Sequence, residues 1–256
     1  MNDSLDNKLL ENIETFVGFF ESKIDCIEKA AFSQQGTLYK QCLYILILDS
    51  LAKTVFPNEK SNHKRFVTFI DTITKWKYSK KYSLTHLIQI LELSHNAQLV
   101  QLLDYARNQQ ESWQKGFIIS IEEDLDCEDI EKLCPESLWK EKIYKSIYLK
   151  DVRHGNLLYT YRSGLVHELR RPGYGMELSK TQNQPYYIGS SQLNFKNNEE
   201  MQWVSSWELV YPLNFFQVLC RDSVRNVKEY YIRENIDPYS VFNFGTYWLE
   251  QMNDND

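Results

Sequence analysis

The stretch that decides the fold is residues 153–175, RHGNLLYTYRSGLVHELRRPGYG. Within it, apolar side chains recur at the three- and four-residue spacing of an α-helix, at Leu157, Leu158, Tyr161, Leu165, Val166 and Leu169. Pro172 and Gly173 end this pattern, because proline cannot continue a helix and glycine suits the turn behind it. The stretch therefore predicts one helix that begins near Val152 and ends in a sharp turn.

Residues able to act on phosphate gather near the C-terminal end of this predicted helix. Arg162 and His167 form an Arg-x4-His pattern, and Ser163 lies beside the arginine. A forked guanidinium binds phosphate oxygens in a bidentate way and keeps its charge. An imidazole, with an ordinary pKa of about 6.5, exchanges protons near neutral pH. Such a pair suits RNA cleavage by the RNA's own 2′-hydroxyl, which leaves a 2′,3′-cyclic phosphate and a 5′-hydroxyl.

These residues stand in a context that resembles a known family, the HEPN superfamily. The likeness rests on YRSGLVHE at 161–168 and RPGYG at 171–175, and it extends to residues 47–52, 65–67, 207–212 and 237–239. Members of the superfamily are all-helical domains, and the active ones are metal-independent RNases with an Arg-x4-6-His motif. The resemblance implies a homodimeric endoribonuclease that acts in phage defence or as a toxin. Other members have lost catalysis.

The resemblance also implies which residues form the site. Arg162, His167 and Ser163 take the catalytic positions, although the family often has Asn or Asp where this chain has the shorter Ser163. We expect RNA-binding or supporting roles for Arg170, Arg171, His154 and Asp49. The resemblance implies no cofactor and no metal. It leaves room for an antitoxin or a defence-system partner besides RNA and a second copy of the chain.

Helix geometry shapes the expected site. Residues five apart lie about 140° apart around the helix axis and about 7.5 Å apart along it, so Arg162 and His167 do not share one stripe. One helix alone makes a poor active site, and the HEPN resemblance implies a dimer in which two copies of the helix face each other across one cleft. Alternatively, Arg162 pairs with Glu168 or Asp49, and His167 is a helix-end histidine favoured by the helix dipole. On that reading the chain is a non-catalytic HEPN-like module that binds RNA, a nucleotide or a protein.

Composition limits the classes that remain. A chain of 256 residues predicts a single HEPN-like domain over residues 1–256. The net charge of −6 means that RNA would need a local basic patch, for which Lys75, Lys77, Lys80 and Lys81 are candidates unless they form a solvated helix end. Five cysteines without a Cys-x-x-Cys pair favour reduced thiols and a cytoplasmic location. The apolar run at 42–48 is too short to span a bilayer, so we expect no membrane contact.

The rest of the chain predicts a mainly α fold, a HEPN-like helical bundle with a small β insertion at residues 174–209. Expected helices cover residues 7–31, 37–55, 62–76, 84–93, 97–107, 135–148, 211–232 and 239–251. Short β-like segments fall at 117–121, 176–178, 185–188 and 203–209. We read the acidic run at 122–131 as a solvated loop and helix start. His63, His86 and His95 show no metal-binding spacing, and the chain lacks a nucleophile elbow and a Walker-type phosphate loop.

Overall fold

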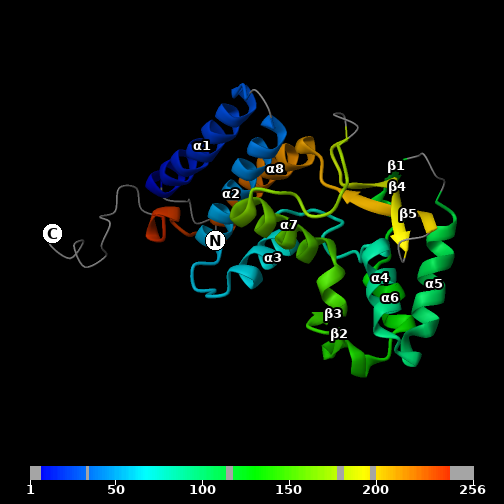
Figure 1. Ribbon diagram of the computed structural model, residues 1–256. Helices are drawn as coiled ribbons and strands as arrows, with labels where there is room; N and C mark the ends of the chain where they lie inside the picture. Colours follow the sequence, from blue (N-terminus) through cyan, green and yellow to red (C-terminus); the bar gives the residue numbers. More distant parts are fainter. Residues whose placement is uncertain (1–6, 33–34, 114–117, 178–181, 197–199, 243–256) are drawn as a thin grey trace. The chain divides into compact units, whose positions relative to one another are not determined.

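The computed structural model describes residues 7–32, 35–113, 118–177, 182–196 and 200–242, with no side chains described at 190–205 (Figure 1). The protein is mainly α-helical with a small antiparallel sheet, as the sequence predicts. The chain divides into two compact units. The first comprises residues 1–31, 43–75 and 219–256, and the second comprises residues 32–42 and 76–218. The single-domain expectation stays a prediction, because the two units are described separately.

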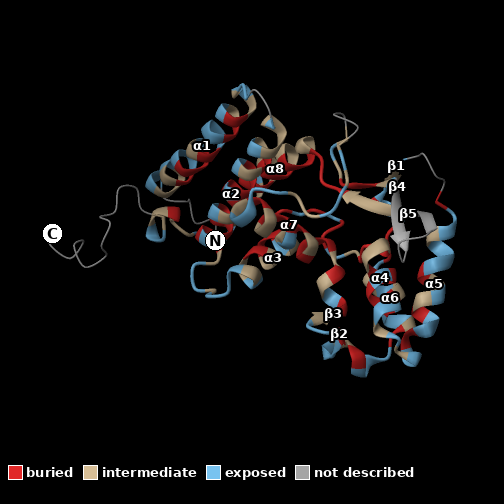
Figure 2. Ribbon diagram, viewed as in Figure 1, coloured by how far each residue is buried: buried red, intermediate tan, exposed pale blue. Residues whose placement is uncertain are grey.

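Amphipathic helices build the first unit. It contains α1 (Asn7–Lys29), α3 (Asn62–Thr72) and most of α2 (Gly36–Val55) and α8 (Leu213–Glu234). One face of α1 is buried and the other exposed (Figure 2), and the buried face carries Ile13, Phe16, Val17, Phe20, Ile24 and Ile27. The Phe16 ring packs edge-on against Tyr231 of α8, with ring centroids 5.5 Å apart. Each such buried side chain stabilises the fold by about 1.5–3 kcal/mol.

Four predicted helices that lie wholly or mostly in the first unit are confirmed, with the end of the third placed too late. The third was expected to reach residue 76, but α3 ends at Thr72. The backbone of Lys75 then has a φ of 56°, which a continuing helix does not allow. Of the last predicted helix, the structure describes only a 3-10 turn at Pro238–Ser240 and the two residues after it. Residues 243–251 lie outside the described part of the chain.

The second unit combines helices with a three-stranded sheet. Helices α4 (Leu84–Ser94) and α5 (Val100–Glu111) contact each other, and α6 (Cys127–Leu133) and α7 (His154–Glu168) follow. The sheet has the order β1 (Ile118–Ser120), β4 (Tyr186–Lys196) and β5 (Glu200–Val210), all antiparallel (Figure 1). Tyr187 of β4 pairs with Ile119 of β1 and with Leu209 of β5. The β-hairpin predicted within 174–209 is thus present, but a strand that precedes α7 joins its edge.

Three predictions about the second unit are wrong. Residues 176 and 177, expected in a β-like segment, lie in no strand. Residues 135–148 do not form a helix; they form a 3-10 turn at Glu136–Lys140 and a small hairpin of β2 (Lys142–Tyr144) and β3 (Ile147–Tyr148). Aromatic and β-branched residues favour strands, and Lys145 makes the turn with a φ of 50°. The acidic run at 122–131 is not solvated throughout either. It starts α6 as expected, but Asp124 is buried.

Candidate functional site

Arg162 and His167 lie together on the last turns of α7. Arg162 Nη1 is 3.1 Å from His167 Nε2. The arginine has 8% of its surface exposed, whereas His167 is exposed. The two residues do not share one stripe of the helix, but the long arginine side chain bridges the angle between them. An arginine only donates hydrogen bonds, so His167 Nε2 is the acceptor and carries the lone pair.

A tight C-terminal cap brings the following segment back against this part of α7. Leu169 adopts the left-handed conformation, with a φ of 50°, and its N–H donates to the carbonyl of Gly164. The N–H of Arg170 donates to the same carbonyl at 3.2 Å. A Cβ on Gly164 would lie 2.9 Å from the Arg170 carbonyl oxygen and 3.6 Å from the Pro172 ring. The glycine of the motif therefore allows the chain to reverse beside the Arg162–His167 pair.

The two arginines after the helix have separate partners. Arg170 pairs with the exposed Glu168. Arg171 Nε donates to the buried amide oxygen of Gln41 at 2.9 Å. The same oxygen accepts from the Tyr161 hydroxyl at 3.2 Å, and the Gln41 amide nitrogen donates to the Tyr211 carbonyl at 2.9 Å. Arg171 thus holds the turn in place, and of these two arginines Arg170 is the more exposed.

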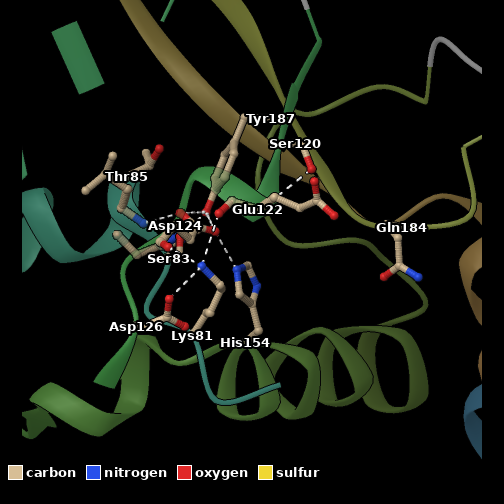
Figure 3. A network of polar contacts seen from close by, with 12 residues as sticks. Lys81, Ser83, Thr85, Ser120, Glu122, Asp124, Asp126, His154, Gln184 and Tyr187 are labelled. Carbon is tan, nitrogen blue, oxygen red and sulfur yellow. Dashed lines mark hydrogen bonds and ion pairs between the residues drawn. The ribbon is translucent and has the colours of Figure 1, made fainter. Parts of the chain in front are cut away.

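His154 lies at the first position of α7 and is fully buried. Its Nε2 is 2.6 Å from Asp124 Oδ2 (Figure 3). A carboxylate only accepts, so this nitrogen donates. His154 has no exposed surface and therefore does not touch RNA. Of its two predicted roles, RNA binding and support of the site, its position allows the second.

Asp124 is the centre of a buried polar network that the sequence did not indicate (Figure 3). Its carboxylate accepts from the Tyr187 hydroxyl at 2.8 Å and from the backbone N–H of Leu84 at 2.7 Å. The Tyr187 hydroxyl also lies 2.7 Å from Ser83 Oγ. Burial, followed by the charge of Asp124, raises the pKa of Tyr187 well above its ordinary value, so the tyrosine stays a donor. The network ties β4, the start of α4 and the start of α7 together.

The N-terminus of α4 is capped by a residue that is distant in the sequence. Ser83 occupies the N-cap position but makes no side-chain capping bond. Asp124 caps the helix from 40 residues away. Ser83 Oγ instead contacts His86 Nδ1 at 2.7 Å. Burial, then the charge of His154, lowers the pKa of His86 to about 4. No local pattern could reveal a cap supplied from this distance.

Two further predictions concern Asp49 and Ser163. Asp49 lies on α2 in the first unit and Arg162 lies in the second, so its support of Arg162 stays a prediction. Ser163 is partly exposed beside Arg162. Its catalytic role stays a prediction as well.

Three of the four lysines proposed as a basic patch have carboxylate partners, and Lys80 is exposed. Lys75 belongs to the first unit and pairs with Glu229 at 2.7 Å. In the second unit, Lys77 pairs with Glu122 at 3.3 Å, and Lys81 pairs with Asp126 at 3.2 Å. The interleaved aromatic side chains Trp76, Tyr78 and Tyr82 are buried, so they offer no surface for base stacking.

Comparisons with known proteins give no information about this site. The chain has no significant match to a family model, to a curated protein or to a solved structure. Within the ranges described, no three His, Cys, Asp or Glu residues group so as to hold a metal ion. None of the described helices has both the length and the apolar character that a bilayer crossing requires. Among the described residues, the Arg162–His167 pair places an exposed imidazole in contact with a guanidinium.

Proposed function

We propose that the protein is a metal-independent endoribonuclease of the kind that the HEPN resemblance implies, with Arg162 and His167 as its reacting residues. The observation that carries the proposal is their 3.1 Å contact at an exposed end of α7. A phosphate oxygen that replaces His167 as the partner of Arg162 would receive a charge-assisted hydrogen bond. The same exchange would free His167 Nε2 to accept a proton.

The proposed reaction follows from these two groups. His167 Nε2 takes the proton of a 2′-hydroxyl as its oxygen attacks the adjacent phosphorus. The new O2′–P bond forms while the P–O5′ bond breaks, and the departing 5′-oxygen takes up a proton. Arg162 stabilises the negative charge that grows on the phosphate oxygens. The products are a 2′,3′-cyclic phosphate and a 5′-hydroxyl.

A second copy of the chain supplies what one copy lacks in this proposal. One imidazole accepts the proton from the 2′-hydroxyl, and an acid must protonate the leaving oxygen. Two copies of α7 facing each other would offer both imidazoles and would double the local positive charge, which a chain of net charge −6 needs to hold RNA. We place the activity in phage defence or a toxin system, with an antitoxin or defence-system protein as a further partner.

Purified protein incubated with total RNA in EDTA tests the proposal. We expect cleavage by the unchanged chain, and a loss of about 10²–10⁴-fold in His167→Ala, the usual contribution of a general acid or base. Arg162→Ala should lose at least as much. Arg107→Ala is a matched control, because Arg107 is exposed and pairs with Glu92 at 2.7 Å on another helix. Equal cleavage by all four proteins would show that the activity does not come from this pair.

One observation favours a second candidate, a non-catalytic HEPN-like binding module. Arg162 is mostly buried, contacts His167 and has its Cζ 5.6 Å from the centre of the Tyr159 ring. Such a pair can serve to stabilise the C-terminal end of α7. This candidate predicts RNA binding without cleavage. Binding through phosphates should weaken steeply as the salt concentration rises.

A further inference from the structure

The most exposed large apolar side chains of the described residues are clustered in one segment. Tyr174 is 76% exposed, Met176 is 70% exposed and Leu169 is 61% exposed. All three lie in the eight residues that follow α7, so they flank the turn behind the Arg162–His167 pair. Single exposed apolar residues are normal on proteins, whereas a cluster of them marks a binding surface.

The backbone that carries Tyr174 is held on both sides. Gly173 has a φ of 74°, and the Tyr174 N–H donates to Glu208 Oε2 at 3.3 Å. A Cβ on Gly175 would lie 2.8 Å from Val210 Cγ2, so this glycine packs against the end of β5. Upstream, Arg171 is fixed to Gln41. The main chain is thus fastened around a tyrosine ring that projects into solvent.

The segment also limits how far the Tyr174 backbone lies from α7. Pro172 contacts the position of Gly164 on α7, three residues before His167. Tyr174 is two residues further on, so its Cα lies within about 7 Å of that of Pro172. A nucleotide chain bound at Arg162 would reach this ring with a neighbouring base.

We propose that Tyr174 is a substrate-contacting residue that stacks on an unpaired base of single-stranded RNA, next to the phosphate held at Arg162. The proposal rests on the proposed function for the place of that phosphate. A ring with its face free binds any base, and only an unpaired base exposes its own face to it. Stacking by Tyr174 therefore assigns single-stranded RNA as the substrate class.

The character of the segment favours a nucleic acid over a protein. The exposed apolar residues alternate with Arg170, Arg171 and two glycines instead of forming one continuous apolar face. Arg170 is exposed, and its pair with Glu168 is a surface pair of little strength, so its guanidinium can turn to a phosphate. An aromatic ring beside arginines on a fixed turn is a combination that single-stranded nucleic acid requires.

Fluorescence anisotropy with a labelled, unstructured RNA of about 12 nucleotides tests the proposal. All binding is measured in the His167→Ala background, so that cleavage does not interfere. We expect Tyr174→Ala to raise Kd about 5- to 150-fold, the range given by losing one base stack. Tyr174→Phe keeps the ring and should bind within about twofold of its parent. Tyr39→Ala is the matched control, since it removes another exposed tyrosine, and it should leave Kd unchanged.

Each outcome decides the proposal. It is overturned if Tyr174→Ala binds RNA as its parent does. It is also overturned if Tyr174→Ala dissociates oligomers in sedimentation without changing the RNA affinity, because the segment is then an interface between copies. The same RNA in a fully paired duplex should bind equally with and without the ring. If Tyr174→Ala binds RNA more weakly and the unchanged chain does not cleave RNA, the stacking role of Tyr174 stands and the proposed nuclease activity does not.

Discussion

Removing the carboxylate of Asp124 should be among the most damaging single changes in the second unit. The Asp124→Ala substitution takes away the acceptor of His154 Nε2 at 2.6 Å and of the Leu84 N–H at 2.7 Å. Tyr187 keeps an acceptor in Ser83 Oγ at 2.7 Å. Two buried donors are left without a partner, and each costs about 1–3 kcal/mol. We therefore expect a loss of about 2–6 kcal/mol in the free energy of unfolding.

Urea unfolding followed by circular dichroism measures this loss. Glu123→Ala is the matched control one residue away, because Glu123 is an exposed carboxylate. Its loss should stay below about 1 kcal/mol. Asp124→Asn should fall between the two, since its amide oxygen can still cap Leu84 while its nitrogen faces His154. A loss below 1 kcal/mol for Asp124→Ala would refute the reasoning, because the network would then contribute no more than a surface pair.

Three further perturbations test separate parts of the fold. Gly164→Ala should destabilise the protein by about 1–3 kcal/mol, because the new Cβ would lie 2.9 Å from the Arg170 carbonyl oxygen. Gly18→Ala places its Cβ with nothing within 4 Å and should stabilise the protein by up to about 1 kcal/mol. Thermal unfolding compares the two variants. The pKa of His86 is about 4 in the folded protein, against an ordinary value of 6.5. The stability linked to this group is therefore full above pH 6.5 and falls by up to about 3 kcal/mol as the pH drops toward 4. Unfolding midpoints should fall over this pH range, and they should fall less in His86→Asn. Gln41→Leu removes the acceptor of Arg171 Nε, which holds the turn after α7. It should lower the free energy of unfolding by about 1–3 kcal/mol and raise protease cleavage after Arg170. Unchanged cleavage would contradict the role of Gln41 in holding the turn.

Local patterns predicted the helices because each one buries its own apolar stripe. The helix expected at 7–31 is α1, which ends two residues early at Lys29. The helix expected to begin near Val152 is α7, which begins at His154. The spacing of residues 144, 147 and 148 fits a helix and a short hairpin equally well, so periodicity alone chose wrongly there.

The buried network could not be predicted, because its members are far apart in sequence. Asp124 looks like any other residue of an acidic run, and its burial depends on Tyr187, 63 residues away, and on His154, 30 residues away. His154 was singled out only for its place near the motif. By contrast, Arg162 and His167 were found through their spacing. Helix geometry does not reveal their direct contact, because it describes the backbone and takes no account of the arginine's reach.

End-group analysis of RNA products tests the central claim most directly. RNA incubated with the purified protein in EDTA should yield 5′ fragments that end in a 2′,3′-cyclic phosphate and 3′ fragments that begin with a 5′-hydroxyl, and RNA with 2′-O-methyl groups throughout should stay intact. Products with a 5′-phosphate, or cleavage of the methylated RNA, would contradict attack by the 2′-hydroxyl and with it the assigned roles of Arg162 and His167.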